Sequence, residues 1–370
     1  MRVLHLNAAQ VYGGIESYLA TLARCRDLVP DVLPEFGICY AGRLIDELRG
    51  LGVRVHVLGP ARFRYPWTIW KVRRRLARVL SSTRYDLAVT HGFWQHAVFA
   101  PVLARYAVPV VFQHHGFVLE ETPLLRKSRR HPPVAALSVS GPIDANFRGL
   151  FPGIPSRVIY PPVVVAPSAD RGATRKRIRA ELDTSDDAVV IVVAARLEAW
   201  KGQLSLIRAA AKLADQPAWT IWIAGGPQHP SELAFAESIR REVVQRGLEG
   251  RVRSLGQRGD IADVYRAADI HCQPNTGPEP FGIAFVEALA CGLPVVTTAM
   301  GGPLEIVTPD CGILVPPEDP EALAGALASL IDVADLRFRL AGAAPGRAKA
   351  ICDPATQMRA IADYFTEVLR

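Results

Sequence analysis

Short runs of apolar residues alternate along this chain with longer stretches that have the periodicity of amphipathic helices. Strands that are separated by helices in this way predict βαβ units, in which a parallel sheet carries helices on both faces. The predicted strands fall into two groups, one in each half of the chain. They are Val3–Leu6, Val53–Leu58, Leu87–Thr90, Val108–Phe112 and Ala135–Val139, followed by Ala188–Ala194, Trp219–Ala224, Val252–Leu255, Ile270–Gln273 and Pro294–Thr298.

A proline-rich segment, Tyr160–Pro167, divides the two groups of strands, and its prolines disfavour helix. With 370 residues, 49% of them hydrophobic, the chain can bury two ordinary cores. We therefore predict an α/β protein of two doubly wound parallel-sheet domains, at residues 1–165 and 166–353. A C-terminal helix, about 354–370, is expected to rejoin the first domain. Two such domains facing each other would enclose a ligand cleft at the carboxyl ends of their strands.

The sequence indicates neither a targeting segment nor a disulfide framework. Met1–Asn7 contains too few apolar residues for a signal peptide, and no apolar run approaches the roughly 18 residues that a spanning helix needs. The six cysteines are widely spaced and form no Cys-x-x-Cys pair, which is typical of reduced thiols. We expect a cytoplasmic protein, either free or peripheral on the cytoplasmic face of the membrane.

The excess of positive charge is confined to the first half of the chain. Residues 1–165 contain 21 Lys and Arg against 10 Asp and Glu, whereas the remaining residues contain 22 against 26. Within Thr68–Leu80 the apolar positions fall on one side and most cations elsewhere, which predicts a basic amphipathic helix. Such a helix either rests on an anionic membrane or packs on its own sheet. Nucleic acid is not expected, because no nucleic-acid-binding module accompanies the charge.

Two glutamates flank the start of a predicted helix in the second half. A strand ends near Pro274, a Gly-Pro turn follows, and the helix is expected from about Phe281 to Cys291. Glu279 precedes this helix and Glu287 lies inside it. The N-terminus of the helix suits a phosphate or a sugar hydroxyl, and a carboxylate can accept two hydroxyls of a polyol. The alternative is a capping acid and a solvated helical glutamate.

Two further segments have the composition of phosphate sites. Arg196 follows a buried strand and Lys201 follows on a loop, so that two cations could bind a pyrophosphate. Gly13 and Gly14, after the first strand, could form a backbone nest for phosphate or sugar. The alternatives are a surface Arg and Lys and an ordinary turn. The Gly-x-Gly-x-x-Gly spacing of a dinucleotide site is absent, which disfavours an NAD enzyme.

Together these residues resemble the GT4 family (glycosyl transferases group 1), whose GT-B architecture consists of two Rossmann-like domains. The resemblance covers nearly the whole chain and is strongest from Ala188 to Pro320. It implies that Glu279 contacts the donor sugar, that Glu287 contacts the ribose, and that Arg196 and Lys201 bind the diphosphate. It also implies main-chain contacts with the donor from Gly13, Gly14, Gly256, Gln257, Arg258, Phe281, Gly282 and Ile283.

The run Pro109–Phe117 resembles the strand that ends in the family's active-site histidine. Counting along it favours His115, with His114 as the alternative. An imidazole there could hydrogen-bond the sugar or orient the acceptor, although a histidine at a strand end can also be a packed structural residue. The acceptor-side residues that the resemblance implies are Tyr12, Glu16, His91, Trp94 and His114.

The resemblance implies retaining transfer of a hexose from a UDP- or GDP-sugar, with His115, Arg196, Lys201 and Glu279 as catalytic residues. The acceptor would be a glycan, a lipid-linked molecule or a small molecule, as in bacterial cell-surface polysaccharide or glycolipid synthesis. No cofactor or metal is expected, because the chain contains no Asp-x-Asp triplet. The alternatives are a nucleotide-sugar epimerase of the same architecture and a non-catalytic protein that binds sugar nucleotides.

Overall fold

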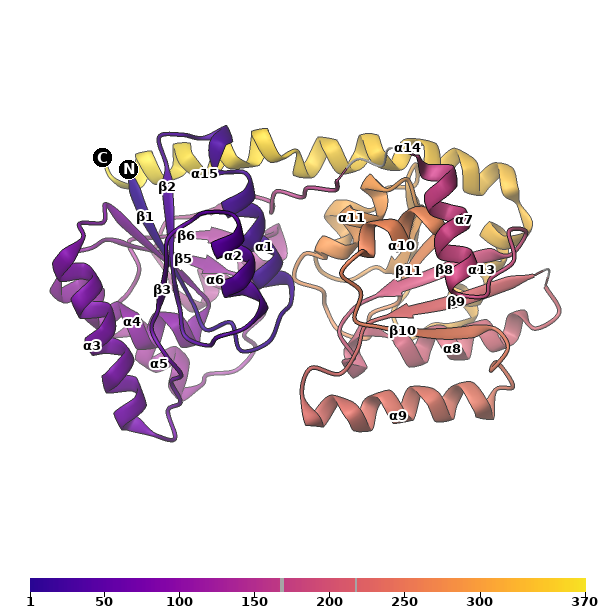
Figure 1. Ribbon diagram of the computed structural model, residues 1–370, viewed down its shortest axis with the longest axis horizontal. Coiled ribbons are helices and arrows are strands. Elements are labelled where there is room, and N and C mark those ends of the chain that lie inside the picture. The colour runs from indigo at the N-terminus through magenta and orange to yellow at the C-terminus, as the bar shows by residue number, and fades with distance from the viewer. Residues whose placement is uncertain (167–169, 217) are drawn as a thin grey trace. The chain divides into compact units, whose positions relative to one another are not determined.

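The computed structural model divides the chain into two compact units, which are described separately (Figure 1). Unit 1 contains Met1–Val163 and Cys352–Arg370, and unit 2 contains Val164–Ile351. The structure describes residues 1–166, 170–216 and 218–370. Residues 160–166 of the predicted linker form neither helix nor strand, and Pro167 lies outside the described residues. Throughout the described ranges, every helix falls short of the length or the apolar content that a membrane span requires.

The sheet of unit 1 has seven parallel strands in the order β3-β2-β1-β4-β5-β6-β7. The strands are β1 (Arg2–Asn7), β2 (Leu33–Ile38), β3 (Val55–Val57), β4 (Leu87–His91), β5 (Val110–His114), β6 (Ala135–Ser138) and β7 (Ser156–Val158). The helices are α1 (Gly14–Arg24), α2 (Arg43–Gly50), α3 (Pro66–Ser82), α4 (Phe93–Arg105), α5 (Pro123–Arg129), α6 (Gly141–Leu150) and α15 (Pro354–Val368). The strand order reverses between β1 and β4, where a doubly wound sheet presents its ligand crevice.

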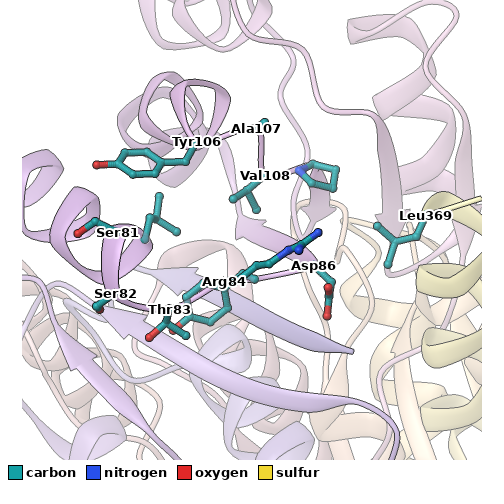
Figure 2. Close-up of a pocket in the computed structure, with 12 residues that line it drawn as sticks. Ser81, Ser82, Thr83, Arg84, Asp86, Tyr106, Ala107, Val108 and Leu369 are labelled. Carbon is teal, nitrogen blue, oxygen red and sulfur yellow. The ribbon is translucent and has the colours of Figure 1, made fainter.

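Apolar stripes on α3 and α4 pack against one face of this sheet. Ile69, Val72 and Leu76 of α3 form a buried cluster with Phe99 of α4 and Leu4 of β1. A cavity of about 680 Å³ lies beside the residues that immediately precede β4 and β5 (Figure 2). It is therefore at the edge of the sheet opposite the carboxyl ends, and none of the predicted site residues lines it.

The sheet of unit 2 has six parallel strands in the order β10-β9-β8-β11-β12-β13 and reverses between β8 and β11. The strands are β8 (Val189–Ala194), β9 (Trp219–Ala224), β10 (Val252–Gly256), β11 (Ile270–Gln273), β12 (Val295–Thr298) and β13 (Gly312–Val315). The helices are α7 (Arg171–Glu181), α8 (Gln203–Ala210), α9 (Pro230–Gln245), α10 (Ile261–Ala267), α11 (Ile283–Ala290), α12 (Pro303–Ile306), α13 (Pro320–Asp332) and α14 (Ala334–Cys352).

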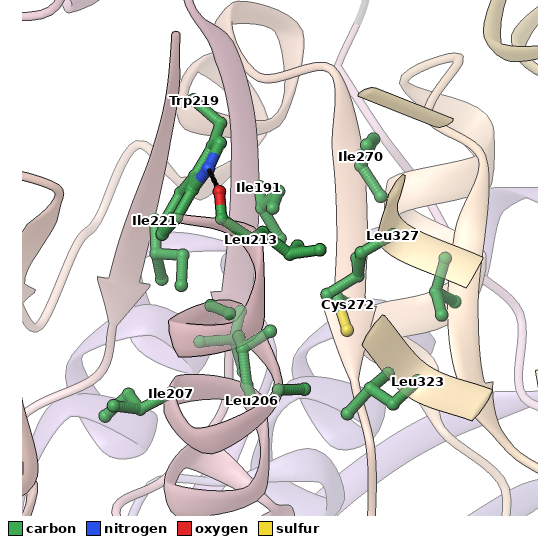
Figure 3. Close-up of a cluster of buried hydrophobic side chains, with 14 of the residues drawn as sticks. Ile191, Leu206, Ile207, Leu213, Trp219, Ile221, Ile270, Cys272, Leu323 and Leu327 are labelled. Atoms are coloured by element: carbon green, nitrogen blue, oxygen red, sulfur yellow. Dashed lines mark hydrogen bonds between the residues drawn. The ribbon is translucent and has the colours of Figure 1, made fainter. Parts of the chain in front are cut away.

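The core of unit 2 lies between this sheet and helices α8 and α13 (Figure 3). Ile191 and Ile221 project from neighbouring strands towards Leu206 of α8. Trp219 is 2% exposed, and its indole N–H donates to the carbonyl of Leu213, which satisfies its one polar group. The predicted fold class, two doubly wound parallel-sheet domains, is therefore confirmed.

Candidate active site

Three of the predicted residues of unit 2, Arg196, Lys201 and Glu279, lie where its strand order reverses. Arg196 and Lys201 follow β8, and Glu279 follows β11, which is hydrogen-bonded to β8 in the centre of the sheet. Because these strands are parallel, their carboxyl ends meet at the same edge. The loops after β8 and β11 therefore bring together side chains that are about 80 positions apart in the sequence, as Lys201 and Glu279 are.

Glu279 is the centre of a buried hydrogen-bond network. Its Oε2 accepts from Nζ of Lys201 at 2.6 Å, from Nδ2 of Asn275 at 3.0 Å and from Nε2 of Gln273 at 3.2 Å. The Lys201 ammonium also lies 3.9 Å from the centre of the Trp200 ring. Glu279 is only 6% exposed, and a buried carboxylate is tolerated because it is paired and hydrogen-bonded. This arrangement fixes the orientation of the Glu279 carboxyl.

Sequence reasoning missed Gln273 and Asn275 as members of this network. The available signal was two amide side chains at the end of a buried strand, where an apolar residue would pack more easily. Thr297 and Thr298 of β12 support them by donating to the main-chain carbonyls of Gln273 and Asn275, each at 2.8 Å.

Glycines allow the loops around Glu279 to approach one another. At Gly202, where φ is +78°, an added Cβ would lie 1.8 Å from the carbonyl oxygen of Pro274. At Gly301, where φ is +70°, it would lie 2.2 Å from the carbonyl oxygen of Glu279. Any side chain at either position would meet main chain, which cannot rotate away as a side chain can. This contact brings the Lys201 loop within hydrogen-bonding distance of Glu279.

Arg196 is more accessible than Lys201. Its Nη1 lies 2.9 Å from Oε1 of Glu198, and its side chain is 37% exposed. The other carboxyl oxygen of Glu198 accepts from the Trp200 indole at 3.1 Å, so Glu198 holds its position. An exposed ion pair of this kind is weak, and a doubly charged anion can compete for the guanidinium.

Helix α11 begins two residues later than predicted. It runs from Ile283 to Ala290 and not from about Phe281 to Cys291, because Gly282 adopts the left-handed conformation at φ +104°. Phe281 is buried before it. The first amides of the helix, starting at Ile283, lack partners within the helix, as at any helix N-terminus. They lie in the chain segment that directly follows Glu279 and can bind an anion there.

Glu287 lies inside α11, and burial raises the pKa of its carboxyl to about 7. This pKa lies above that of an unfolded chain, so between about pH 4.5 and 7 the folded state binds more protons than the unfolded state. Stability should therefore fall as the pH rises through this window. In Glu287→Gln, which cannot ionise, this fall should be absent. Urea unfolding of both proteins at pH 5 and pH 8 measures the difference, and parallel pH profiles would contradict the prediction.

The predicted base-reading segment follows β10. Gly256 has φ +64°, and its carbonyl accepts from the amide of Gly225 at 2.8 Å, which joins the ends of β9 and β10. The Arg258 guanidinium is held by Asp260 at 2.8 and 2.7 Å and by Glu181 at 2.5 Å, and these carboxylates raise its pKa. The Arg258 side chain is therefore committed to ion pairs, so a contact with a base would fall to the main chain of this segment, Gln257 included.

In unit 1, Glu16 holds the predicted glycine loop. Its carboxylate accepts from the amide of Gly13 at 3.0 Å and from Nδ2 of Asn7 at 2.9 Å. Helix α1 then begins at Gly14, so this carboxylate also lies at the positive end of the helix dipole. Tyr12 donates to Glu47 at 2.7 Å. Tyr12 and Glu16, two of the five predicted acceptor-side residues, thus have contacts that shape the loop.

The two neighbouring histidines after β5 have different surroundings. His114 is 1% exposed, packs against Phe93 and Phe147, and donates from Nε2 to Oδ1 of Asn146 at 3.0 Å. Because the same atom also accepts from the main-chain amide of Val118, it is the amide oxygen, which can only accept, and the hydrogen of this bond lies on His114. His115 is partly exposed, and its Nε2 lies 3.0 Å from Nδ1 of His91. His114 thus has the environment of a structural residue, and His115 the environment expected of a site residue.

His91 and Trp94 do not belong to the same cluster. His91 is buried between the rings of His115 and His5, whereas Trp94 packs edge-on against Phe63 and joins the apolar cluster of α3 and α4. The assignment of Trp94 to the acceptor side stays a prediction without a supporting contact.

Two family models match the chain. Residues 3–140 match the glycosyl transferase 4-like domain, and residues 174–347 match glycosyl transferases group 1. A D-inositol 3-phosphate glycosyltransferase of Kineococcus radiotolerans is 30% identical over 72% of this chain and 68% of its own length. A protein of the same name from Corynebacterium efficiens is 36% identical over 48% of this chain, and the match spans only 44% of that relative.

Among solved structures, the Anabaena protein HepE in complex with UDP-glucose has a TM-score of 0.87 and 24% sequence identity, covering 99% of this chain and 100% of HepE. The likeness shows the fold, the GT-B architecture of two Rossmann-like domains. The matches of both units to the family models, together with the Kineococcus relative, identify the family. The chain belongs to the GT4 family, the glycosyl transferases group 1.

Proposed function

We propose that this protein is a retaining glycosyltransferase that moves a hexose from a UDP-sugar to a phosphate-bearing acceptor. GDP-sugar is the alternative donor. The observation that carries the proposal is the network in which Glu279 is held by Lys201, Gln273 and Asn275, in the segment that leads into α11. Arg196 precedes Lys201 on the loop that follows β8. A buried, oriented carboxylate that a lysine contacts, with an arginine on the same loop and a helix N-terminus after it, combines hydroxyl recognition with diphosphate recognition.

In the proposed reaction the protein supplies position and charge. The bond between the anomeric carbon and the diphosphate oxygen breaks as the acceptor hydroxyl attacks from the same face, so the configuration is retained. The hydroxyl proton passes to the departing phosphate. Arg196, Lys201 and the amides at the start of α11 stabilise the negative charge that develops on the diphosphate, Glu279 holds the sugar, and Glu287 binds the ribose. His115 hydrogen-bonds the sugar or orients the acceptor. No metal takes part, so activity should survive EDTA.

The acceptor proposal rests on charge and on the relatives. Unit 1 carries all of the positive excess, and relatives that match most or part of the chain are named as D-inositol 3-phosphate glycosyltransferases. An acceptor that carries a phosphate would account for the positive charge of unit 1 and would match the acceptor that the relatives' names give. It could belong to a small phosphorylated polyol or to the head group of a lipid-linked acceptor, and assays with a soluble inositol phosphate and with a lipid-linked acceptor distinguish the two.

Helix α3 supports contact with an anionic membrane. It buries Ile69, Val72 and Leu76 but leaves Trp67 and Trp70 each 58% exposed. The guanidinium groups of Arg73 and Arg75 donate to main-chain carbonyls, whereas the remaining cations of residues 62–78 are exposed. Exposed tryptophans among cations are typical of a surface that inserts at the level of lipid head groups. We propose peripheral binding to the membrane through this face.

Replacing Trp67 and Trp70 with alanine should weaken binding to vesicles of anionic phospholipid about tenfold or more, because both rings would lie in the interface. Cosedimentation at low and high salt measures this effect. Phe338→Ala, which removes a 66% exposed aromatic ring from unit 2, is the matched control and should bind like the wild type. Equal binding by the double variant and the wild type would exclude this face as the membrane-binding surface.

A thermal-shift panel of UDP-, GDP- and ADP-sugars tests the donor. A ligand at a hundred times its dissociation constant stabilises the folded state by about 2.7 kcal/mol, so the true donor should raise the Tm clearly. A UDP-sugar is expected to give the largest shift, and no shift with any of them would contradict the proposal. An epimerase would isomerise the donor in the absence of an acceptor, whereas a non-catalytic protein would bind the donor and leave it unchanged.

A further inference from the structure

Three histidine rings of unit 1 form a continuous line of hydrogen bonds. Nδ1 of His5 lies 3.0 Å from Nε2 of His91, and Nδ1 of His91 lies 3.0 Å from Nε2 of His115. His5 pairs with Val89, two residues before His91, and His91 pairs with Gln113, two residues before His115. Side chains two residues apart in a strand share a face, so all three rings stand on one side of the sheet.

The line leads from the interior to an accessible ring. His5 and His91 are 4% and 1% exposed, whereas His115 is partly exposed. Tyr18 of α1 covers the two outer rings, with ring centres 6.0 Å from His91 and 5.5 Å from His115. The His5 ring stacks on Phe36 at 5.4 Å and lines a cavity of about 20 Å³ beside α15.

Burial keeps the three rings neutral. It lowers the pKa of His5 and of His115 to about 3 and that of His91 well below its usual value. A neutral imidazole has one N–H and one lone pair. Since both nitrogens of His91 are in hydrogen bonds, His91 must donate at one and accept at the other.

Only two arrangements satisfy every bond in the line. If Nδ1 of His5 donates, then Nδ1 of His91 donates to His115, and the remaining nitrogen of His115 carries its hydrogen. If Nδ1 of His5 accepts, His115 donates inward, and its remaining nitrogen is a bare acceptor. The tautomer of the innermost ring is therefore coupled to that of the outermost ring.

We propose that His5 is a positioning residue that acts through His91 to hold His115 in a single tautomer. The inference rests on the proposed function, in which His115 meets the sugar or the acceptor, because the tautomer decides whether its outer nitrogen donates or accepts there. His5 itself touches neither substrate. A ring that served packing alone would be replaceable by phenylalanine, whereas a ring that sets a tautomer is not.

Two variants separate these roles. His5→Phe keeps an aromatic ring against Phe36 but removes the nitrogen that meets His91. His5→Asn places an amide near the position of Nδ1, and its N–H can donate to Nε2 of His91 as Nδ1 of His5 does in the first arrangement. His96→Phe is the control, because His96 is a buried histidine of the same unit whose partners are Thr90 and the carbonyl of His131, outside the line.

Long-range proton–nitrogen spectra of protein labelled with ¹⁵N-histidine report the tautomer of His115 directly. We expect one tautomer in the wild type, in His5→Asn and in His96→Phe, and a mixture in His5→Phe. In transfer assays, kcat of His5→Phe should fall about tenfold or more, with KM for the nucleotide sugar within about twofold, and His5→Asn should recover most of the loss.

Averaged tautomers of His115 in the wild type would overturn the proposal. So would an unchanged single tautomer in His5→Phe together with a kcat no lower than that of His96→Phe. If His5→Phe does not fold, the wild-type and His5→Asn spectra still decide, since the proposal requires one tautomer in both. Failure of the proposed function is recognisable separately. It would appear as a wild type without transfer activity, whereas the spectra report the tautomer of His115 whether or not the protein transfers sugar.

Discussion

Arg196→Ala should lower kcat for sugar transfer about 100-fold or more, while the variant remains as well folded as the wild type. Arg196 is an accessible cation at the carboxyl end of β8, and among the described residues its guanidinium pairs with Glu198 alone. In the proposed reaction it stabilises the charge that grows on the leaving diphosphate, and removing one such donor costs about 10²- to 10³-fold in turnover. Steady-state kinetics with a saturating UDP-sugar measure the loss.

Arg208→Ala is the control for Arg196→Ala. It removes an arginine of α8 that pairs with Glu242 at 3.0 Å and is 51% exposed, in the same unit and with no link to the Glu279 network. Glu242 keeps a second partner, Arg246 at 3.1 Å, when Arg208 is removed, so the kinetics of Arg208→Ala should match the wild type. If Arg196→Ala kept wild-type turnover, the diphosphate role of Arg196 would be wrong.

Gly202→Ala should destabilise the protein by about 3 kcal/mol and weaken donor binding about tenfold or more. Two costs combine, the left-handed backbone at φ +78° and the approach of the new Cβ to 1.8 Å from the carbonyl oxygen of Pro274. The loops after β8 and β11 would have to separate, which would draw Lys201 away from Glu279. Urea unfolding and titration with UDP measure the two effects.

Gly247→Ala isolates the backbone cost. Gly247 follows α9 with φ +65°, and an added Cβ would have no heavy atom within 4 Å. The substitution should cost about 1 kcal/mol and leave the affinity for UDP unchanged. Equal destabilisation by the two alanines would mean that the loops can move apart freely, and the packing account of the site would be wrong.

The sequence pattern predicted the fully buried strands such as β4, β5 and β11, because a continuous apolar run leaves little alternative in an α/β chain. It also predicted the partly exposed edge strands β3 and β10. It missed three strands of mixed composition. Pro34 and Glu35 interrupt β2, β7 has only the three residues Ser156–Val158, and β13 begins directly at Gly312 after a turn. Their pairing is tertiary, since β7 and β13 are edge strands that gain order from the neighbour they join.

For the candidate site, spacing predicted which charged residues follow the central strands but not how they are held. Nothing in the sequence shows that Lys201 reaches Glu279, because this contact joins the loops after β8 and β11, which become neighbours only in the folded sheet. The bond from the Gly13 amide to Glu16 is local, because the two residues are three positions apart and form a capping box at the start of α1. Counting along β5 could favour His115 only weakly over His114. The side to which each ring points, and so its partner Asn146 or His91, is a property of the folded sheet.

The most direct test of the central claim follows an isotope label in the sugar of UDP-glucose, incubated with the protein and a phosphorylated acceptor. The account predicts that the label appears on the acceptor with the anomeric configuration of the donor, in the presence of EDTA, and that Glu279→Ala abolishes the transfer. Label that stayed in an isomerised donor, or a product of inverted configuration, would contradict it.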